Sequence, residues 1–189
     1  MHQTELKPIS ENEYLALEAE SPVRHELVGG QVYAMAGASV RHNRIALNLA
    51  SRLLAAAGQD CQVFISDIKL RADALPTYYY PDVMLVCDPS DDDALIKTRP
   101  CLIAEVLSPA TEAIDRREKL AAYQRIASVR EYLLIAQDTP RVEIYRRRNL
   151  REWLLETLTP PDELRLESID LALPVAELHA GLPPEGEAA

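Results

Sequence analysis

The sequence predicts an α/β (α+β) protein in which helices flank a mixed β-sheet, with additional hairpins toward both ends. Between residues 40 and 136, segments with helical and strand-like patterns follow in the order helix, strand, strand, strand, helix, strand, which is typical of a sheet covered by helices. Segments 25–35 and 141–158 each hold two short strand-like runs around a turn. We expect one domain over 1–180 and a flexible tail at 181–189.

Capping residues and glycines predict the first elements. Ser10 followed by Glu13 forms the capping-box pattern, which predicts a short helix over residues 10–20. In segment 25–35, a Gly-Gly pair separates two runs of strand-forming residues. That pattern is typical of a β-hairpin with a two-residue turn.

A longer helix is predicted from about residue 40 to residue 57. Ile45, Leu49 and Leu53 recur every four residues and so share one apolar face. Gly58 follows in the position where glycine often ends helices. The other expected elements are strands at 61–71, 80–87, 101–107 and 131–136, an acidic loop at 88–99, a helix at 113–127, a hairpin formed by 141–147 and 150–158, a strand near 164–167 and a short helix around 174–180.

Composition limits the classes of function. The net charge of −10, from 30 acidic and 20 basic residues, argues against a protein that coats nucleic acid regardless of sequence, although the local field around a site can differ from the total. No apolar stretch is long enough to span a membrane, so no membrane partner is expected. The first seven residues lack the apolar core of a secretory signal, and we therefore expect a cytoplasmic location.

The three cysteines, Cys61, Cys87 and Cys101, are far apart and lie in apolar, strand-like runs. Their spacing matches no zinc motif. We expect them to be small buried side chains without a bond between them.

Two carboxylates at the ends of apolar runs are the strongest indication of chemistry. Asp82 begins the run at 80–87, and Glu105 lies inside the run at 101–107. Because an acid among apolar residues is costly to desolvate, two such acids on neighbouring strands indicate a site for a hard cation such as Mg²⁺. The carbonyl of Val106 is a further candidate ligand. Lys119, on the next helix, could stabilise charge in hydrolysis of a phosphodiester.

Each of these residues also has a purely structural interpretation. Asp82 follows a proline, and such a pair can mark a turn. Glu105 is harder to explain in this way, because its neighbours on both sides are apolar. Lys119 could form an exposed ion pair with Asp115, four residues earlier, but it shares a helix face with Tyr123 at the border of the apolar stripe.

In combination, these residues resemble the PD-(D/E)XK nuclease superfamily and, more narrowly, the Uma-type family of bacterial restriction endonucleases. The stretches that carry the resemblance span roughly residues 10 to 175 and are His25–Val32, Arg41–Asn43, Tyr80–Val83, Ala104–Pro109, Asp115–Tyr123 and Val129–Tyr132. Their order and spacing are more specific than any one of them. The resemblance implies a restriction-endonuclease-like core of a helix, three strands, a helix and a strand.

The resemblance also implies roles for individual residues. Asp82 and Glu105 would bind Mg²⁺, or Mn²⁺ in its place, and Glu26 would complete the acidic cluster. The superfamily's lysine normally stands two residues after the second acid, where this chain has Leu107. In the Uma-type pattern that role passes to Lys119.

Other candidate residues are secondary. His42, Tyr123 and Arg116 are candidates for binding the substrate, although His42 at the start of a helix could instead cap backbone amides or lie exposed. Asp67 could face either solvent or the acidic cluster. The aromatic run Tyr78–Tyr80 could stack on bases, but such residues more often pack in the core.

The function expected from the sequence is a Mg²⁺-dependent endonuclease that acts on DNA. Cleavage of both strands of a duplex would commonly require a homodimer. Two alternatives remain open at this point. One is a catalytically silent, metal-binding interaction module of the same fold, and the other is a hydrolase of small phosphodiesters.

Overall fold

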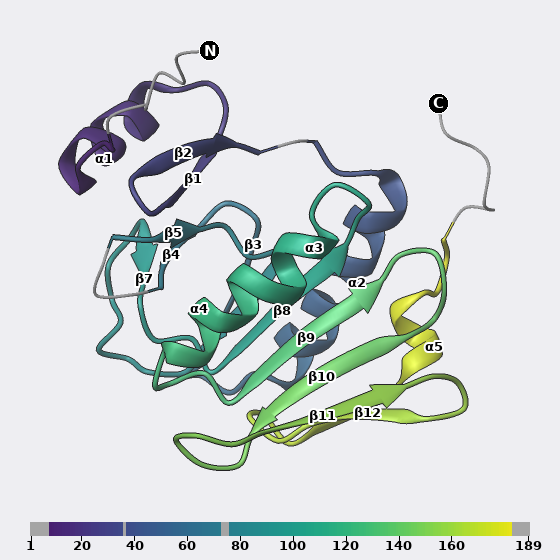
Figure 1. Cartoon of the computed structure of the whole chain (residues 1–189). Coiled ribbons are helices and arrows are strands. Elements are labelled where there is room, and N and C mark those ends of the chain that lie inside the picture. The colour runs from purple at the N-terminus through teal and green to yellow at the C-terminus, as the bar shows by residue number, and fades with distance from the viewer. Residues whose placement is uncertain (1–7, 36, 73–75, 183–189) are drawn as a thin grey trace.

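The computed structural model describes residues 8–35, 37–72 and 76–182 and shows three β-sheets with helices packed against them (Figure 1). The expected tail at 181–189 lies outside the described residues from 183 onward. In chain order the elements are α1 (Glu11–Glu20), β1 (His25–Val28), β2 (Gln31–Ala34), α2 (Val40–Ala56), β3 (Gln62–Ile65), β4 (Lys69–Arg71), β5 (Tyr78–Tyr79), β6 (Val83–Val86), β7 (Ile96–Lys97), β8 (Leu102–Leu107), α3 (Glu112–Ile114), the π-helix η1 (Asp115–Lys119), α4 (Leu120–Arg125), β9 (Glu131–Ala136), β10 (Val142–Arg147), β11 (Trp153–Leu158), β12 (Glu163–Leu166), β13 (Leu171–Pro174) and α5 (Val175–Leu178).

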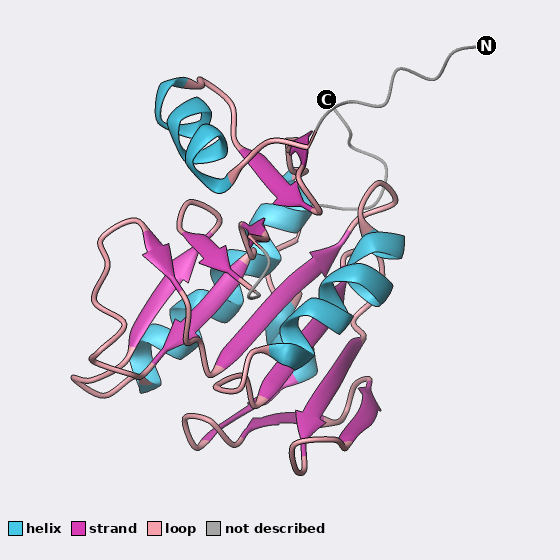
Figure 2. Ribbon diagram, turned by 60° about the vertical axis from the view of Figure 1, so that its left-hand side comes forward, coloured by secondary structure: helices cyan, strands magenta, loops and turns pink. Residues whose placement is uncertain are grey.

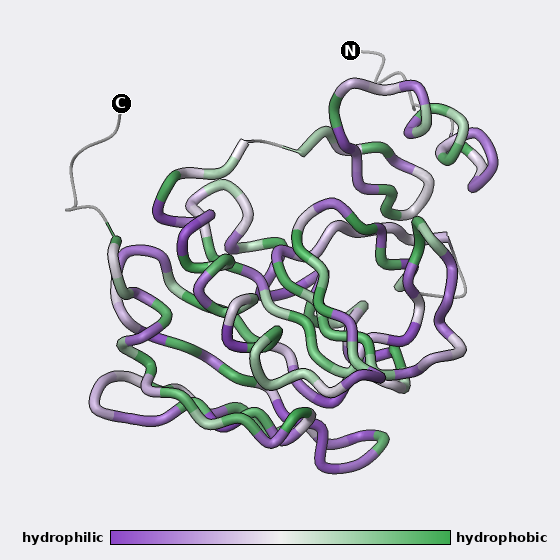
Figure 3. Tube along the Cα trace, turned by 180° about the vertical axis from the view of Figure 1, so that it is seen from behind, coloured by the Kyte–Doolittle hydropathy of each residue, from purple (hydrophilic) through white to green (hydrophobic). Residues whose placement is uncertain are grey.

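The largest sheet has six strands in the order β11-β10-β9-β8-β6-β3. Strands β8 and β9 are parallel, and every other neighbouring pair is antiparallel, so the sheet is mixed, as expected. Helices lie on both of its faces (Figure 2). Apolar residues run through the inner strands, whereas the outer loops are mostly hydrophilic (Figure 3).

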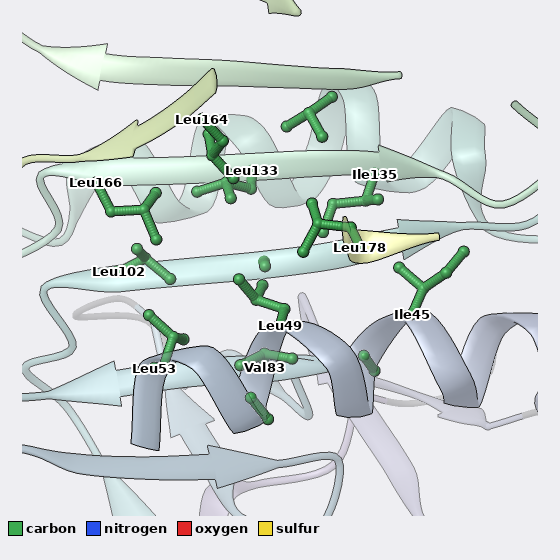
Figure 4. Packing of buried hydrophobic residues seen from close by; sticks show 14 of the residues in the cluster. Ile45, Leu49, Leu53, Val83, Leu102, Leu133, Ile135, Leu164, Leu166 and Leu178 are labelled. Atoms are coloured by element: carbon green, nitrogen blue, oxygen red, sulfur yellow. The ribbon is translucent and has the colours of Figure 1, made fainter. Parts of the chain in front are cut away.

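One face of this sheet packs against α2. Ile45, Leu49 and Leu53 are fully buried and point at Val83 and Leu102 of the sheet (Figure 4). The hairpin β12–β13 and α5 extend the same core. Helix α2 ends because Ala57 is extended; Gly58 does not adopt a left-handed conformation, so its expected role is not seen.

The opposite face packs against α4 through an aromatic cluster. The ring of Tyr123 meets the rings of Tyr79 and Tyr132 edge-on, with centroids 5.4 and 5.1 Å apart. Glu105 points toward this second core, because the alternate strand residues Ala104 and Val106 belong to the first.

A smaller, five-stranded sheet has the order β2-β1-β5-β4-β7. Gly29 and Gly30, with φ of 57° and 79°, form the expected turn between β1 and β2. The aromatic run Tyr78–Tyr80 is buried, and its first and last hydroxyl groups donate hydrogen bonds to Glu11 and Glu18 of α1. Tyr78 and Tyr80 thus anchor the first helix, and because all three rings are buried, none is available to stack on bases.

Several expected elements are divided in the structure. The run at 61–71 is not one strand, because Ser66 has a φ of 46° and the chain passes there from the large sheet (β3) to the small one (β4). The run at 80–87 contributes β6 only from Val83 onward. The helix expected at 113–127 contains five residues of π-helix, and the C-terminal strand pairs with β13, which was not expected.

The expectation for the cysteines was wrong. Cys61 and Cys87 form a disulfide because they stand opposite each other where β3 meets β6. Cys101 keeps a free thiol, with its Sγ atom 3.6 Å from that of Cys87. All three are only partly buried. In the described part of the chain, no helix has the length and apolar character needed to cross a bilayer.

Candidate active site

Asp82 lies in the short link between β5 and β6, directly before the strand begins. Its Oδ2 accepts a hydrogen bond from the Val106 N–H at 2.7 Å and lies 3.1 Å from His42 Nε2. The pairing of Val83 with Ala104 brings this link alongside β8. The two predicted acids therefore meet, and the side chain of Asp82 keeps 15% of its surface exposed.

Glu105 lies in β8, all of whose residues are buried. Its Oε1 accepts hydrogen bonds from the Tyr123 hydroxyl at 2.8 Å and from Lys119 Nζ at 3.2 Å. Its Oε2 lies 3.4 Å from the N–H of Asp82. Burial raises the pKa of Glu105 well above its ordinary value, and the nearby acids raise it further, against the opposing effect of Lys119.

Lys119 is buried at the end of η1, where its ammonium group lies among three carboxylates. Its Nζ is 3.0 Å from Glu26, 3.2 Å from Glu105 and 3.5 Å from Asp115. Burial disfavours the ammonium form, but these acids outweigh that effect and raise the pKa of Lys119 well above its ordinary value. Short π-helical insertions are frequent at functional sites.

Glu26 reaches the cluster from β1, which belongs to the other sheet. Its Oε1 lies 3.0 Å from Lys119 Nζ and 3.4 Å from the N–H of Tyr80. The cluster thus joins the two sheets at one point.

Asp115 is a member of the cluster that was not predicted. It was considered only as the partner of Lys119 in an exposed ion pair, but both side chains are buried. Burial raises the pKa of Asp115, and among the described residues its Oδ1 accepts no hydrogen bond, although Lys119 Nζ lies 3.5 Å away. Its position four residues before Lys119 and its place at the start of the Asp115–Tyr123 stretch were the sequence signals, and neither reveals that both side chains point inward.

His42 lies in the first turn of α2 and contacts Asp82. It does not cap the helix, because the Ser39 hydroxyl accepts the hydrogen bond from the His42 N–H. Burial disfavours the charged imidazolium, but the hydrogen bond to Asp82 and the charge of Asp82 outweigh burial and raise the pKa of His42.

The other two predicted substrate-binding residues do not reach the open side of the cluster. Tyr123 is fully buried and its hydroxyl contacts Glu105, so it can orient that carboxylate but cannot touch a substrate. Arg116 points away toward β10 and is held by Glu143 and Glu112. Asp67 is exposed and paired with Arg24, away from the acids.

The donor set fits the divalent cation that the resemblance implies. Three carboxylates surround the Lys119 ammonium group, and Asp82 lies beside one of them, Glu105. Within the described part of the chain, Asp115 Oδ1 has only the ion pair with Lys119 and accepts no hydrogen bond. Asp82, Glu105 and the Val106 carbonyl, which faces the same side as its N–H, are the oxygen ligands that Mg²⁺ binds together with water. Among the described residues, no group of three or more His, Cys, Asp or Glu side chains is arranged to hold a metal ion by itself.

Surface access to the cluster is shallow. His42, Asp82 and Glu26 keep 13–15% of their side-chain surface exposed, whereas Lys119 and Glu105 keep 7% and 4%. Two surface hollows of about 460 and 290 Å³ lie elsewhere, around Arg71 and Thr98. Neither is lined by residues of the cluster.

Comparisons with known proteins agree with this fold and point to one family. Residues 11–176 match the family model Uma2, described as "Putative restriction endonuclease". Two uncharacterized proteins of Synechocystis sp., slr1290 and sll1609, are 35% identical over 176 residues and 39% identical over 157 residues, which is 92% and 80% of this chain and 93% and 88% of theirs. A crystal structure from Anabaena variabilis, described as "a putative nuclease belonging to DUF820", has a TM-score of 0.76 at 18% identity and covers 91% of this chain and 98% of its own.

Proposed function

Since the chain belongs to the Uma2 family, we propose that it is a Mg²⁺-dependent endonuclease with a restriction-endonuclease-like core that hydrolyses phosphodiester bonds of DNA. The observation that carries this proposal is the meeting of Asp82, Glu105 and Lys119, from the start of β6, from β8 and from the following helix. The family's description and the similar fold of the Anabaena variabilis protein support it.

In this proposal Asp82, Glu105 and the Val106 carbonyl hold Mg²⁺, or Mn²⁺ in its place. The cation would neutralise the phosphate and supply a bound water of lowered pKa. The protein's own contribution is preorganisation. The Val106 N–H and His42 fix the carboxylate of Asp82, and the Tyr123 hydroxyl fixes that of Glu105.

Lys119 takes the place of the superfamily's lysine. The usual position, two residues after Glu105, is occupied by Leu107, which is buried in the apolar core. An ammonium group that enters from the helix lies within 3.2 Å of the same glutamate. We assign it the stabilisation of negative charge that develops on the phosphate oxygens.

The shape of the surface supports a polymer substrate over a small phosphodiester. Pockets for small molecules usually enclose most of the ligand, whereas in the part of the chain that the structure describes this cluster is exposed along Glu26, His42 and Asp82. A DNA strand laid across that opening would present a phosphate to Asp82 without entering a cavity. The silent interaction module remains the second candidate, favoured by the burial of Glu105 and Lys119.

The test is a plasmid-cleavage assay with Mg²⁺, Mn²⁺ or EDTA. Wild type should nick DNA only with metal, and Asp82→Asn and Lys119→Met should each lose at least about a hundredfold in rate. Asp67→Asn is the matched control, because it removes one exposed carboxylate outside the cluster, and it should retain full activity.

Other outcomes would change the assignment. Loss of cleavage in Asp82→Asn but not in Lys119→Met would keep the metal site and remove the lysine from the mechanism. Absence of cleavage by a folded wild type on plasmid, single-stranded DNA and RNA would favour the silent module. Hydrolysis of a model phosphodiester alone would favour the small-substrate alternative.

A further inference from the structure

Strand β11 leaves one side of its backbone open at the edge of the six-stranded sheet. On its other side β11 pairs with β10, with Glu156 opposite Ile144 and Trp153 opposite Arg147. Hydrogen bonds at the hairpin end, where the Arg148 N–H donates to the Glu152 carbonyl, set the phase of this ladder. Because the bonding direction alternates along an antiparallel pair, the even-numbered residues of β11 bond to β10.

The odd-numbered residues of β11 therefore direct their N–H and carbonyl groups outward. These residues are Trp153, Leu155 and Thr157, and no hydrogen bond to their backbone from beyond the sheet edge occurs within the described residues. The hairpin β12–β13 does not close this edge, because its two strands pair only with each other. An outer strand of six residues thus offers three donors and three acceptors to a partner.

This edge also lacks the features that usually prevent pairing. Proteins protect outer strands with charged residues, proline or bulges, but β11 has no proline and its one charged residue, Glu156, is held by Arg146 at 2.7 Å. Leu154 and Leu155 are 41% and 47% exposed. The other outer strand, β3, has only four residues, so β11 is the edge better suited to a partner.

We propose that β11 pairs with β11 of a second copy of this chain, antiparallel and about a two-fold axis at Leu155. In this register Leu155 lies opposite its own copy, and Trp153 lies opposite Thr157 of the partner subunit. It is the one antiparallel register that pairs all three outward-facing residues with one another, and each of the three pairs exchanges two backbone hydrogen bonds.

The side chains are compatible with this self-pairing. On one face Leu155 meets a second leucine, and on the other face Leu154 stands opposite a glutamate that already has an arginine partner. Like charges do not stand opposite each other within the paired strands, which removes the usual penalty. A two-fold contact of this kind uses the same patch on both subunits and closes the edge, so it ends at a dimer.

The dimer has a consequence for the proposed nuclease and, in this respect, rests on that proposed function. Glu105 is level with Thr157 of β11, through Leu134 and Glu143 on the intervening strands. Seven interstrand steps and a shift of four residues along the strands would separate the two copies of Glu105, on the order of 36 Å if the sheet were flat. Both lie on the same face of the joined sheet, and the twist of the sheet turns the two sites relative to each other. One turn of DNA is about as long, so the two sites could serve the two strands of one duplex.

The first measurement is the mass of the full chain in solution by size exclusion with light scattering. Wild type should have about 42 kDa, twice the chain mass of 21.1 kDa. Leu155→Lys places two ammonium groups opposite each other and should reduce the mass to that of one chain, with an unchanged circular dichroism spectrum. Leu54→Lys is the matched control: it is an exposed leucine on α2, and its variant should remain dimeric.

The second measurement is amide hydrogen exchange, which reports whether the outward-facing N–H groups of β11 are hydrogen-bonded. In wild type the N–H groups of Trp153 and Thr157 should be protected, and Leu155→Lys should make both exchange much faster while those of Leu154 and Glu156 stay protected by β10. A monomeric wild type, or a dimer that Leu54→Lys dissociates and Leu155→Lys does not, would overturn the proposal.

Cleavage assays distinguish a failure of the dimer proposal from a failure of the nuclease proposal. Asp82→Asn should remain a dimer whether or not the protein is a nuclease. If the wild type cuts DNA, Leu155→Lys should still nick one strand but should linearise plasmid much more slowly. Equal linearisation by a verified monomer would refute the role of the dimer in double-strand cleavage.

Discussion

Two buried glutamates on neighbouring strands, Glu105 on β8 and Glu131 on β9, have opposite surroundings. Both oxygens of Glu131 accept backbone hydrogen bonds, from Glu167 and Ser168 at 3.0 and 2.9 Å, and Arg146 lies beside it. Among the described residues, Glu105 has side-chain partners and one long contact with the N–H of Asp82, and further acids crowd it. The first arrangement fastens the C-terminal hairpin to the sheet, and the second leaves negative charge that a cation could neutralise.

The comparison shows that burial of an acid does not by itself indicate a catalytic site. Both glutamates lie in strands whose residues are all buried. What separates them is whether fixed N–H groups or other carboxylates surround the charge. Functional sites often keep such unfavourable charge because their chemistry needs it.

The largest expected effect comes from removing the positively charged side chain beside each glutamate, which is Lys119 at Glu105 and Arg146 at Glu131. Lys119→Met leaves Glu105 and Asp115 buried without an ammonium group and should lower the free energy of unfolding by about 3–5 kcal/mol. Arg146→Met should cost less, because Glu131 keeps its two backbone hydrogen bonds. Urea unfolding at neutral pH measures both, and an equal or larger loss for Arg146→Met would break the comparison.

Replacing Glu105 or Glu131 with glutamine removes the negative charge and tests how much each carboxylate itself contributes to stability. Glu131→Gln presents an amide NH₂ to a backbone N–H and should destabilise the fold by about 1–3 kcal/mol. Glu105→Gln should cost less than this, because burial raises the pKa of Glu105 and so disfavours its ionised form in the folded state, while Lys119 loses one of three carboxylate neighbours. Nuclease activity should nevertheless disappear. Similar losses of stability in both variants would contradict this view.

Addition of Mg²⁺ should stabilise only the crowded cluster. If the cation binds with a dissociation constant near 1 mM, about 10 mM Mg²⁺ should add about 1.4 kcal/mol to the free energy of unfolding. The gain should vanish in Asp82→Asn and persist in Glu131→Gln. Thermal melts with Mg²⁺ and with EDTA provide the measurement, and a gain retained by Asp82→Asn would place the cation elsewhere.

The smallest effect is expected at a pair outside both regions. Hydrogen bonds from Arg116 at 2.5 and 3.0 Å lower the pKa of Glu143 below its ordinary value. A lowered folded-state pKa means that the pair stabilises the fold above the ordinary carboxyl value of 4.5 and that this contribution is lost as the pH falls through the lowered value. Glu143→Gln should therefore cost up to about 1 kcal/mol at pH 7 and nothing near pH 2. A cost that does not change with pH would show that packing, not charge, is responsible.

Local sequence signals predicted the elements whose stabilisation is local. The capping box of Ser10 and Glu13 is present as expected, as is the apolar face of α2 with Ile45 and Leu49. The apparent strand at 61–71 was misjudged, because Val63 and Ile65 alternate in one phase and Ile68 and Leu70 in the other, and this change of phase at Ser66, where the backbone turns, was overlooked. Alternation reports side-chain character and does not show which sheet a residue joins.

For the candidate site, the sequence determined the chemistry of the side chains, and the tertiary structure decided which groups lie next to each of them. Asp82 and Glu105 could be singled out because charge in an apolar run is costly and therefore conspicuous. Lys119 could be singled out from its place at the border of the helix's apolar stripe and from the family resemblance. The sequence could not show that Asp115 points inward, that His42 contacts Asp82 or that Arg116 pairs with Glu143. These contacts depend on the register of the strands and on the wider turn of the π-helix η1. Both are fixed by contacts between distant segments, and such contacts leave no local pattern in the sequence.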